Sequence, residues 1–515
     1  MALVAGALAF AHFAWPSGQV RLDSIGLARV NGPSFGGAGA RISVRSATAA
    51  VIPVRLGRQG RLWPKRPVEP GTRLFVDVVF RRPSWVGWIA GGTQTVRLQL
   101  RAPRAQVTRR WLRLQAGAPL RVSFDRPVRR LELTGDGPPR TRVLPRAQRT
   151  VSLGRSARAG SMGVSAVPRS WERLPAAETV TWFPAGGAAA VLASPRPGSR
   201  LGLDTPLELR FSEPVERLLH GRLPSLQRPV AGRWRTVDAR TLVFTPRGYG
   251  FGLDTPVRVQ LPAPVERASA GSTPGRTITW TTPAASSLRL QQLLALLGYL
   301  PLTWIPKTSD APRTIRGEVA AAIDPPSGHF SWRYPNTPRE LGALWSVGEP
   351  NAITRGAVMR FEDDHGLAVD GFAGADMWRA LMADMIDGKR RHGGYSYVYV
   401  HQTVPQSLNL WHNGHTILSS PGNTGVPAAP TQLGTFPVFE HIPIGTMSGT
   451  NPDGSHYNDP GIRYISYFNG GDAIHAFNRA SFGTPQSLGC VELPLAAAAK
   501  VWPYTPIGTL VTIDP

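Results

Sequence analysis

The chain has 515 residues, about three to four times the usual length of one domain, so several domains in a row are expected. Hydrophobic residues make up 42% of the sequence, which excludes a wholly disordered chain because several cores can be filled. The formal net charge is +25, and it is unevenly spread, since residues 393–515 hold three basic and six acidic residues. The basic character therefore belongs to the first three-quarters of the chain.

The charge predicts contact with a polyanion, either a nucleic acid or an anionic polymer of a cell envelope. No helix-turn-helix, zinc-knuckle or aromatic RNA-binding motif accompanies the arginines, so we expect no nucleic-acid partner. Anionic polymers of a cell envelope fit the charge equally well, and a solvated arginine-rich surface is the simpler alternative. The single cysteine, Cys490, excludes an intrachain disulfide and a paired-cysteine metal site, and the sequence predicts no metal and no cofactor.

Residues 1–17 begin with an apolar run, ALVAGALAFAHFAW, that is too short for an ordinary membrane span. Such a run is typical of a signal-peptide core, so we expect export from the cytoplasm. No basic stretch precedes it and no clear cleavage site follows, which fits a start placed too far downstream. A cleaved signal and a retained membrane anchor both stay open, and membrane contact is expected only through an uncleaved anchor.

Residues 18–284 alternate short Val/Leu/Phe-rich runs with Pro, Gly and Asp, a pattern typical of β-sandwich domains. An internal repeat supports this prediction, because PLRVSFDRPVRRL at 119–131 matches PLELRFSEPVERL at 206–218. In each copy we expect the alternating apolar residues to face one side and the proline to end the strand. The repeats resemble bacterial immunoglobulin-like wall-spacer domains. We therefore expect a β-rich domain at 18–110 and Ig-like β domains at 111–190 and 191–284.

Residues 285–388 change to a helical period. Three short helices are predicted from apolar stripes and flanking caps: Ser287, Leu290, Leu293, Leu294, Leu297 and Gly298; then Ala357, Val358, Phe361 and Gly366; then Met377, Leu381 and Met385. The segments QQLLALLGYL and TRGAVMRFEDDHGLAVDGFAGADMWRAL resemble a peptidoglycan-binding domain. The sequence departs from that family at Glu362, where the family usually has Gln, and in an insertion at about residues 302–345.

Residues 393–515 return to strands such as YSYVYV, LNLWHNG and TLVTI, separated by Asn-Gly turns at 413–414 and 469–470. Within this β-rich domain, IHAFNRASFGTPQSLGCVELP places His475 fifteen residues before Cys490. A thiol is mostly protonated at neutral pH, so a nucleophilic cysteine needs a neighbouring imidazole such as His475. Gly489 lets the chain turn its N–H groups toward a developing oxyanion. The alternative is a buried structural cysteine.

This segment resembles the L,D-transpeptidase catalytic family, whose signature is a His followed by S/T-H-G-C. His475, Ser487, Gly489 and Cys490 occupy that signature, and the stretch from Gly422 to Phe436 is similar to the family's upstream motif. Two departures are Leu488, where the family usually has His, and Glu492, where it has Arg or Asn. The departures concern substrate details more than the nucleophile.

The resemblance implies a cysteine-dependent acyltransferase of the cell wall that forms 3→3 peptidoglycan cross-links. Cys490 would be the nucleophile, His475 the base and Gly489 part of the oxyanion site, with Ser487, Tyr457 and His456 near the substrate. Stem peptides and glycan are the expected partners, in an extracytoplasmic location, secreted or anchored in the envelope. Two alternatives stay open: a catalytically inactive wall-binding structural protein, and an L,D-carboxypeptidase that uses water as acceptor.

The sequence thus predicts a multidomain protein. N-terminal all-β sandwich (Ig-like) modules precede a small three-helix peptidoglycan-binding bundle and a C-terminal β-rich L,D-transpeptidase domain.

Overall fold

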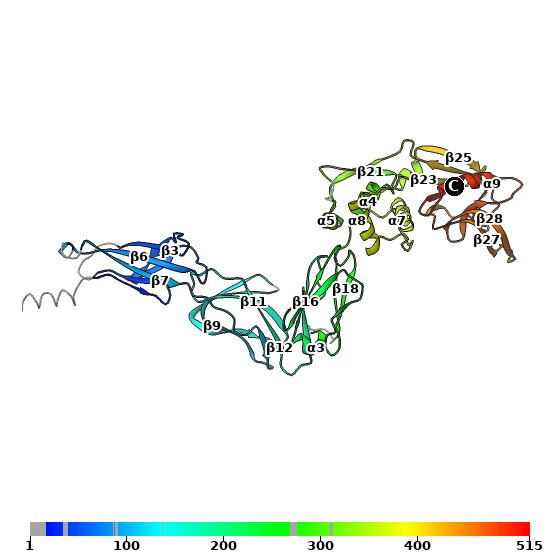
Figure 1. Cartoon of the computed structure of the whole chain (residues 1–515). Coiled ribbons are helices and arrows are strands. Elements are labelled where there is room, and N and C mark those ends of the chain that lie inside the picture. Colours follow the sequence, from blue (N-terminus) through cyan, green and yellow to red (C-terminus); the bar gives the residue numbers. More distant parts are fainter. Residues whose placement is uncertain are drawn as a thin grey trace, which may run out of the picture.

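The computed structural model describes residues 17–33, 40–85, 87, 91–135, 137–267, 275–309 and 313–515. The predicted signal peptide or anchor at 1–17 therefore falls, apart from its last residue, outside the described residues. Within those ranges no helix combines the length and the apolar character that crossing a membrane requires. Figure 1 shows the modules following one another, from the N-terminal β module to the C-terminal domain.

The first module packs two antiparallel sheets face to face, with strand orders β1-β2-β5-β4 and β3-β6-β7. Its elements are β1 (Gln19–Leu22), β2 (Ala28–Asn31), β3 (Ala40–Ser46), β4 (Val54–Leu56), η1 (Arg58–Gly60), β5 (Arg61–Pro64), β6 (Arg73–Arg81) and β7 (Thr93–Arg101). Alternate residues of β6, from Leu74 to Phe80, are buried between the sheets, as expected for a strand with one face in the core. The β-rich prediction for this part of the chain is confirmed at the level of its strands.

The second module is built on one five-stranded sheet with the order β10-β9-β11-β12-β8. Its strands are β8 (Trp111–Leu114), β9 (Pro119–Thr134), β10 (Arg140–Arg155), β11 (Gly160–Val167) and β12 (Glu178–Pro184). The prediction that Pro127 ends a strand is wrong, because β9 runs through it. The ladder with β10 shifts register between Ser123 and Val128, so the missing N–H of Pro127 falls in a bulge where no ladder bond is needed.

The third module is a sandwich of a five-stranded and a three-stranded sheet around one core. Its elements are β13 (Ala190–Ser194), β14 (Leu207–Phe211), α3 (Val215–Leu219), β15 (Ser225–Leu226), β16 (Gly232–Asp238), β17 (Thr241–Pro246), β18 (Pro256–Gln260), β19 (Glu266–Arg267) and β20 (Thr277–Thr281). In this copy of the repeat the strand does end before Pro214, and α3 follows it. The immunoglobulin-like assignment of both repeat modules stays a prediction.

The described part of residues 285–388 holds five helices and one antiparallel strand pair, so the predicted three-helix bundle is not confirmed. The elements are α4 (Ser287–Leu296), β21 (Leu302–Pro306), α5 (Ile315–Ile323), β22 (Gly328–Trp332), α6 (Arg339–Ala343), α7 (Ala352–Asp364) and α8 (Ala375–Asp387). The three expected helices are present as α4, α7 and α8, but Ser286 caps α4 instead of Ser287. The additional elements come from the insertion, whose sequence lacks a long helical stripe.

The C-terminal domain packs two sheets, β25-β24-β23-β31-β26 and β27-β28-β29-β30, across a shared apolar core. Its elements are β23 (Ser396–His401), β24 (Ser407–His412), β25 (His415–Pro421), β26 (Gly434–Pro437), β27 (Glu440–Thr450), β28 (His456–Asn469), β29 (Asp472–Ala476), β30 (Val491–Leu493), α9 (Leu495–Val501), η2 (Trp502–Tyr504) and β31 (Leu510–Asp514). The turn at Asn413–Gly414 has positive φ at both residues, as predicted for an Asn-Gly hairpin.

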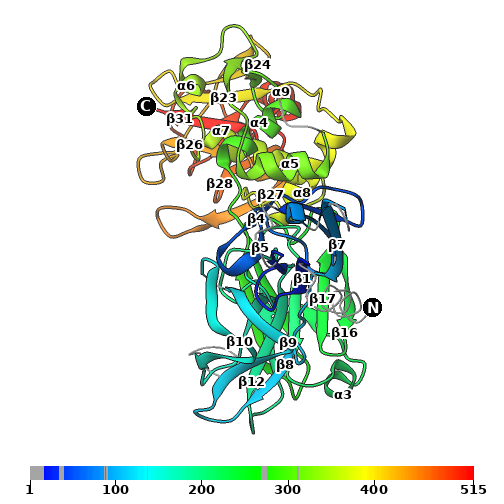
Figure 2. The ribbon, with the colours of Figure 1, turned by 90° about the vertical axis from the view of Figure 1, so that its left-hand side faces the viewer.

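The helical module and the C-terminal domain share one core, because Tyr397, Trp411 and Leu510 belong to the same buried cluster as α4, α7 and α8. In Figure 2 these helices and the C-terminal sheets lie together in the upper half of the picture, and the β modules lie in the lower half. The backbones touch directly: a Cβ on Gly356 of α7 would lie 2.4 Å from the Gly508 carbonyl oxygen. The two parts therefore form a continuous unit.

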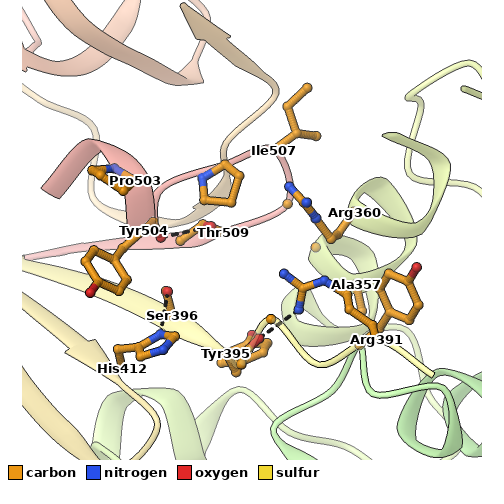
Figure 3. Close-up of a pocket in the computed structure, with 16 residues that line it drawn as sticks. Ala357, Arg360, Arg391, Tyr395, Ser396, His412, Pro503, Tyr504, Ile507 and Thr509 are labelled. Atoms are coloured by element: carbon orange, nitrogen blue, oxygen red, sulfur yellow. Dashed lines mark hydrogen bonds between the residues drawn. The ribbon is translucent and has the colours of Figure 1, made fainter. Parts of the chain in front are cut away.

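A cavity of about 170 Å³ lies at this junction. Arg360 and Arg391 line it from the helical side, opposite His412 and Tyr504 of the C-terminal domain (Figure 3). Asp364 contacts both guanidinium groups, at 2.8 Å from Arg360 and 3.5 Å from Arg391. Because one carboxylate lies between the two cations, the charges on the helical side of the cavity are paired with one another.

Candidate active site

The strand register of the C-terminal domain places His475 and Cys490 on one face of a parallel strand pair. Strands β29 and β30 align Ile474 with Val491 and His475 with Glu492, and Cys490 directly precedes β30. Ile474 and Val491 point into the core between the two sheets. Because side chains alternate along strands, His475, Cys490 and Glu492 share the opposite face. The two predicted catalytic residues are thus diagonal neighbours.

The His475 imidazole is buried and oriented by the backbone. Its Nδ1 lies 3.0 Å from the carbonyl oxygen of Ala476, so the Nδ1–H group donates a hydrogen bond there. Nε2 is then left as the proton acceptor. Burial lowers the pKa of His475, while the Ala476 carbonyl and the Glu492 carboxylate act in the other direction. The resting imidazole is therefore neutral at neutral pH and able to take a proton.

The Cys490 thiol is half-buried and protonated in the resting state. Burial raises the pKa of Cys490 to about 12, and the carboxylates of Asp472 and Glu492 add to this, while the Ala473 N–H lowers it. The thiol hydrogen-bonds to the Gly471 carbonyl oxygen at 3.7 Å. Among the described residues no hydrogen bond joins Cys490 to His475.

Gly489 occupies a position that only glycine fits. Its φ is +112°, a conformation that L side chains rarely adopt, and a Cβ would lie 2.2 Å from Oδ1 of Asp472. Within the described chain no acceptor is hydrogen-bonded to the N–H groups of Gly489 or Cys490. The oxyanion role that the resemblance implied for Gly489 stays a prediction.

Ser487, which was predicted to lie near the substrate, uses its hydroxyl within its own turn. It is buried, and its hydroxyl donates a 2.6 Å hydrogen bond to the carbonyl oxygen of Cys490. Its backbone also pairs with Thr424 and Val426 of the preceding segment. The hydroxyl is thus used to hold the turn that carries Cys490. Leu488, beside it, is half-buried.

The upstream motif identified in the sequence lies directly against this turn. Asn423 forms a backbone bridge with Glu492, and Gly425 forms one with Ser487. The side-chain oxygen of Asn423 also accepts the N–H of Gly483 at 3.0 Å. The two stretches that carried the resemblance, separated by some sixty residues in sequence, are therefore one structural unit.

The hairpin of β27 and β28 supplies the other predicted substrate residues. Burial and then the charge of Cys490 raise the pKa of Tyr457. His456, at the start of β28, is exposed and contacts Thr450, and no interaction with Cys490 is found in the described residues. The sequence did not single out Tyr467, yet burial and then the charge of Cys490 raise its pKa as well. This relation is visible only in the strand pairing.

An open cavity of about 630 Å³ lies between this hairpin and the start of α9. It is lined by Asp459 and Arg463 of β28, by Phe477 just after β29, and by Leu495 of α9. Because Ala476, whose carbonyl orients His475, also lines it, the cavity borders the candidate site. Its volume suits a short peptide segment.

Glu492, the second departure from the resemblance, is buried and paired. Arg479 binds it with two hydrogen bonds, of 2.8 Å from Nε and 2.7 Å from Nη2. The same Nη2 contacts the Gln486 carbonyl oxygen at 3.1 Å. Glu492 is therefore paired with the basic Arg479, and the sequence did not reveal this ion pair.

No group of three or more His, Cys, Asp or Glu side chains able to hold a metal ion is found in the described ranges. His412 and His415 are strand partners across the Asn413–Gly414 turn, and His412 is hydrogen-bonded to Ser396 at 3.0 Å.

The candidate site thus combines a buried, oriented imidazole, a lone thiol and a tight turn, which are groups that acyl transfer through cysteine would require. Comparison with known proteins gives the class. Residues 395–513 match the family model YkuD, the L,D-transpeptidase catalytic domain. This segment is an L,D-transpeptidase catalytic domain, so the resemblance seen in the sequence is confirmed for this part of the chain.

The chain also shows weak similarity to several solved structures. An L,D-transpeptidase from Mycobacterium smegmatis is 13% identical, covering 64% of this chain and 100% of its own, with a TM-score of 0.22. L,D-transpeptidase 3 from Mycobacterium tuberculosis is 12% identical, covering 63% and 99%, with a TM-score of 0.22. The catalytic domain of an E. faecium L,D-transpeptidase acylated by ertapenem is 25% identical, covering 24% and 100%, with a TM-score of 0.21. The search of the curated proteins gave no match.

The identities and TM-scores of these overlaps are low, so the family assignment rests on the match over residues 395–513. The peptidoglycan-binding and immunoglobulin-like assignments of the preceding residues stay predictions.

Proposed function

We propose that the protein is an extracytoplasmic L,D-transpeptidase that forms 3→3 cross-links between peptidoglycan stem peptides through a Cys490 acyl-enzyme. The observation that carries the proposal is the Cys490–His475 pair on one face of β29 and β30, inside a domain of this family. The orientation of His475 by the Ala476 carbonyl and the free N–H groups of Gly489 and Cys490 support it.

The first half-reaction acylates the enzyme. The Cys490 sulfur attacks the carbonyl carbon of the third stem residue, a diamino acid, while the thiol proton passes to Nε2 of His475. The N–H groups of Gly489 and Cys490 stabilise the negative charge on the carbonyl oxygen. The bond to the terminal D-alanine breaks, its amine takes the proton from His475, and a thioester remains on Cys490.

The second half-reaction transfers the acyl group. The side-chain amine of a neighbouring stem attacks the thioester, His475 removes a proton from that amine, and Cys490 leaves as the thiol. Water in place of the amine gives the carboxypeptidase outcome. The neutral resting imidazole suits both steps, because it must accept a proton before it can return one.

Intact-mass measurement after incubation with ertapenem tests the proposal. A carbapenem is the appropriate probe because an E. faecium relative has been solved acylated by this compound. We expect one adduct on the wild-type chain and none on Cys490→Ala. His475→Gln should slow adduct formation by roughly 10²–10⁴, the usual contribution of a general base. Glu349→Gln, an exposed change in the helical module, is the matched control.

The alternatives give different results in the same assay with a tetrapeptide donor. A wild-type chain that forms neither adduct nor thioester identifies an inactive wall-binding protein. Release of D-alanine without a cross-linked dimer, even with excess acceptor stem, identifies a carboxypeptidase. Turnover that persists in Cys490→Ala contradicts the cysteine mechanism.

We propose further that the preceding modules bind the wall. Residues 285–388 are proposed to contact peptidoglycan, and the arginine-rich β modules to contact anionic wall polymers. The second proposal is supported by β10, where Arg140, Arg142, Arg146, Arg149 and Arg155 are all exposed. The core shared by the helical module and the catalytic domain also affects how the first is tested, because deleting residues 285–388 would expose Tyr397, Trp411 and Leu510. Point substitutions are therefore preferable to deletion.

A further inference from the structure

The loop that joins β29 to β30 is fixed by one ion pair beside the candidate base. Arg479 lies four residues after His475 and forms a fork of two hydrogen bonds to the Glu492 carboxylate. Glu492 is 5% exposed at its side chain and Arg479 is 31% exposed. A bidentate pair of this geometry, with its carboxylate out of water, is a strong and orienting contact.

The pair connects the three parts of the site. Glu492 is the strand partner of His475 in the β29–β30 register. Arg479 reaches the Gln486 carbonyl oxygen, one residue before the turn that carries Cys490. Its guanidinium also stacks on Phe477 at 4.5 Å from the ring centroid, and the Phe477 ring meets the His475 ring edge-on at 5.9 Å. One side chain thus touches β30, the residue just after β29 and the loop between the two strands.

We propose that Arg479 is a positioning residue for His475, forming with Glu492 an internal charge pair that balances the electrostatic field at the imidazole and anchors the loop leading to Cys490. The inference deepens the proposed function, on which it rests, because it assumes that His475 is the base of that reaction. Arg479 and Glu492 need not touch the substrate.

The electrostatic part of the inference has a definite sign. Three charged groups act on His475 from the elements around it: Glu492 of β30, Arg479 of the loop and Asp459 of β28. Cys490 is the titratable neighbour on the same strand face. The carboxylates favour the imidazolium and raise the pKa of His475, whereas Arg479 lowers it. Removing Glu492 should therefore lower the pKa of His475, and removing Arg479 should raise it.

A double-mutant cycle on the full-length chain tests this inference. The variants are Glu492→Gln, Arg479→Gln and the double glutamine variant, with Lys500→Gln, an exposed charge in the same domain, as control. The first readout is the titration of the His475 ring by ¹⁵N NMR, assigned by the loss of its signal in His475→Gln. The second is the ertapenem acylation rate as a function of pH.

We expect the midpoint of the His475 titration, and the acid limb of the acylation profile, to move to lower pH in Glu492→Gln and to higher pH in Arg479→Gln. The double variant should return both toward the wild-type position, because no net charge is left. Arg479→Gln should also slow acylation at neutral pH on the order of 10-fold, since the loop loses its anchor. Lys500→Gln should leave both readouts unchanged.

Two outcomes separate this inference from the proposed function. If all three variants lose acylation rate equally while the His475 midpoint stays at its wild-type value, the pair is only structural and the inference is wrong. If the midpoints move in opposite directions but the wild-type chain forms no adduct, the charge pair is confirmed and the proposed function fails.

Discussion

At the scale of single residues, the candidate site depends on a turn that tolerates little change. Gly489 combines a φ of +112° with an approach to Asp472 that leaves no room for a Cβ. Asp472 itself is held by Asn469 at 3.3 Å, and burial raises its pKa. The Asp472 carboxyl therefore leaves no room for a side chain at Gly489, and the Ser487 hydroxyl stabilises the same turn through its hydrogen bond to the Cys490 carbonyl oxygen.

Replacing Gly489 with Ala should lower the free energy of unfolding by about 1–3 kcal/mol, because a non-glycine residue is forced into a sparsely populated backbone conformation. Acylation by ertapenem should fall as well, since the free N–H groups shift with the turn. Thermal unfolding and intact-mass kinetics measure the two effects. Gly471→Ala is the control, as its Cβ would meet no atom within 4 Å.

Adding Asp472→Ala to Gly489→Ala should restore part of the stability, because it removes the 2.2 Å contact but not the unfavourable φ. A Gly489→Ala variant as stable as Gly471→Ala would show that the turn adapts, and the tight-turn account of this site would then be wrong.

At the scale of secondary-structure elements, α7 carries a buried carboxyl where the resemblance expects an amide. Glu362 is 2% exposed and accepts the N–H groups of Gly371 at 2.9 Å and Asp370 at 3.2 Å. Burial raises the pKa of Glu362 from 4.5 to about 7, with the Asp370 charge adding to it. The helix thus holds the loop after it through a group that changes charge near neutral pH.

The sign of the pH effect follows from this shift. A carboxyl whose pKa is raised in the folded state binds its proton more tightly there, so its stabilising contribution is complete below about pH 4.5 and is lost as the pH rises to about 7. Glu362→Gln keeps an acceptor for both N–H groups and has no charge to bury. We expect it to raise the free energy of unfolding by about 1–3 kcal/mol at pH 8 and to change it little at pH 4.

Denaturant unfolding of wild type and variant across this pH range measures the difference, with exposed Glu349→Gln as the matched control. A difference that is equal at pH 4 and pH 8 contradicts the account, because ionisation of Glu362 would then contribute nothing.

The elements also show what the sequence could and could not predict. Local patterns were sufficient for α4, α7 and α8 and for the Asn413–Gly414 hairpin, because helical stripes and turn residues act over a few positions. They failed at Pro127, where a bulge in β9 leaves no ladder bond that would need the missing donor. They also missed the antiparallel pairing of β21 with β22, because α5 separates the two strands in sequence.

The same division applies to the candidate site. The spacing of His475 and Cys490 suggested their pairing, and the parallel register of β29 and β30 is the reason that this spacing works. Arg479 and Tyr467 carried no signal, because their importance comes from contacts with Glu492 and Cys490 that depend on strand pairing and loop path. Ser487 matched the family pattern, yet its hydroxyl faces the backbone of its own turn.

At the scale of the whole molecule, the catalytic domain and the modules before it differ in charge. Residues 393–515 carry more acidic than basic side chains, while the chain as a whole has a net charge of +25. The β modules precede the catalytic unit along the chain, as Figure 1 shows. An arrangement of this kind suits a protein whose basic part is held on a polyanion while a less charged domain acts on peptides.

The edge strand β10 offers the sharpest test of that arrangement. Its five exposed arginines are Arg140, Arg142, Arg146, Arg149 and Arg155. Replacing all five with Gln should reduce the fraction of protein that sediments with purified wall sacculi and make that fraction less sensitive to salt, because fewer surface charges are left to be screened. Ertapenem acylation should be unchanged, since β10 belongs to a different module from Cys490.

Replacing the same five arginines with Lys is the matched control, because lysine keeps the charge and changes the hydrogen-bonding geometry. Sedimentation that survives in the lysine variant and falls in the glutamine variant supports binding by charge alone. If both variants fall, the planar guanidinium groups are needed for bidentate contact with phosphate or carboxylate. If neither variant changes sedimentation at any salt concentration, β10 does not bind the wall, and exposed point variants of the helical module become the next set to measure.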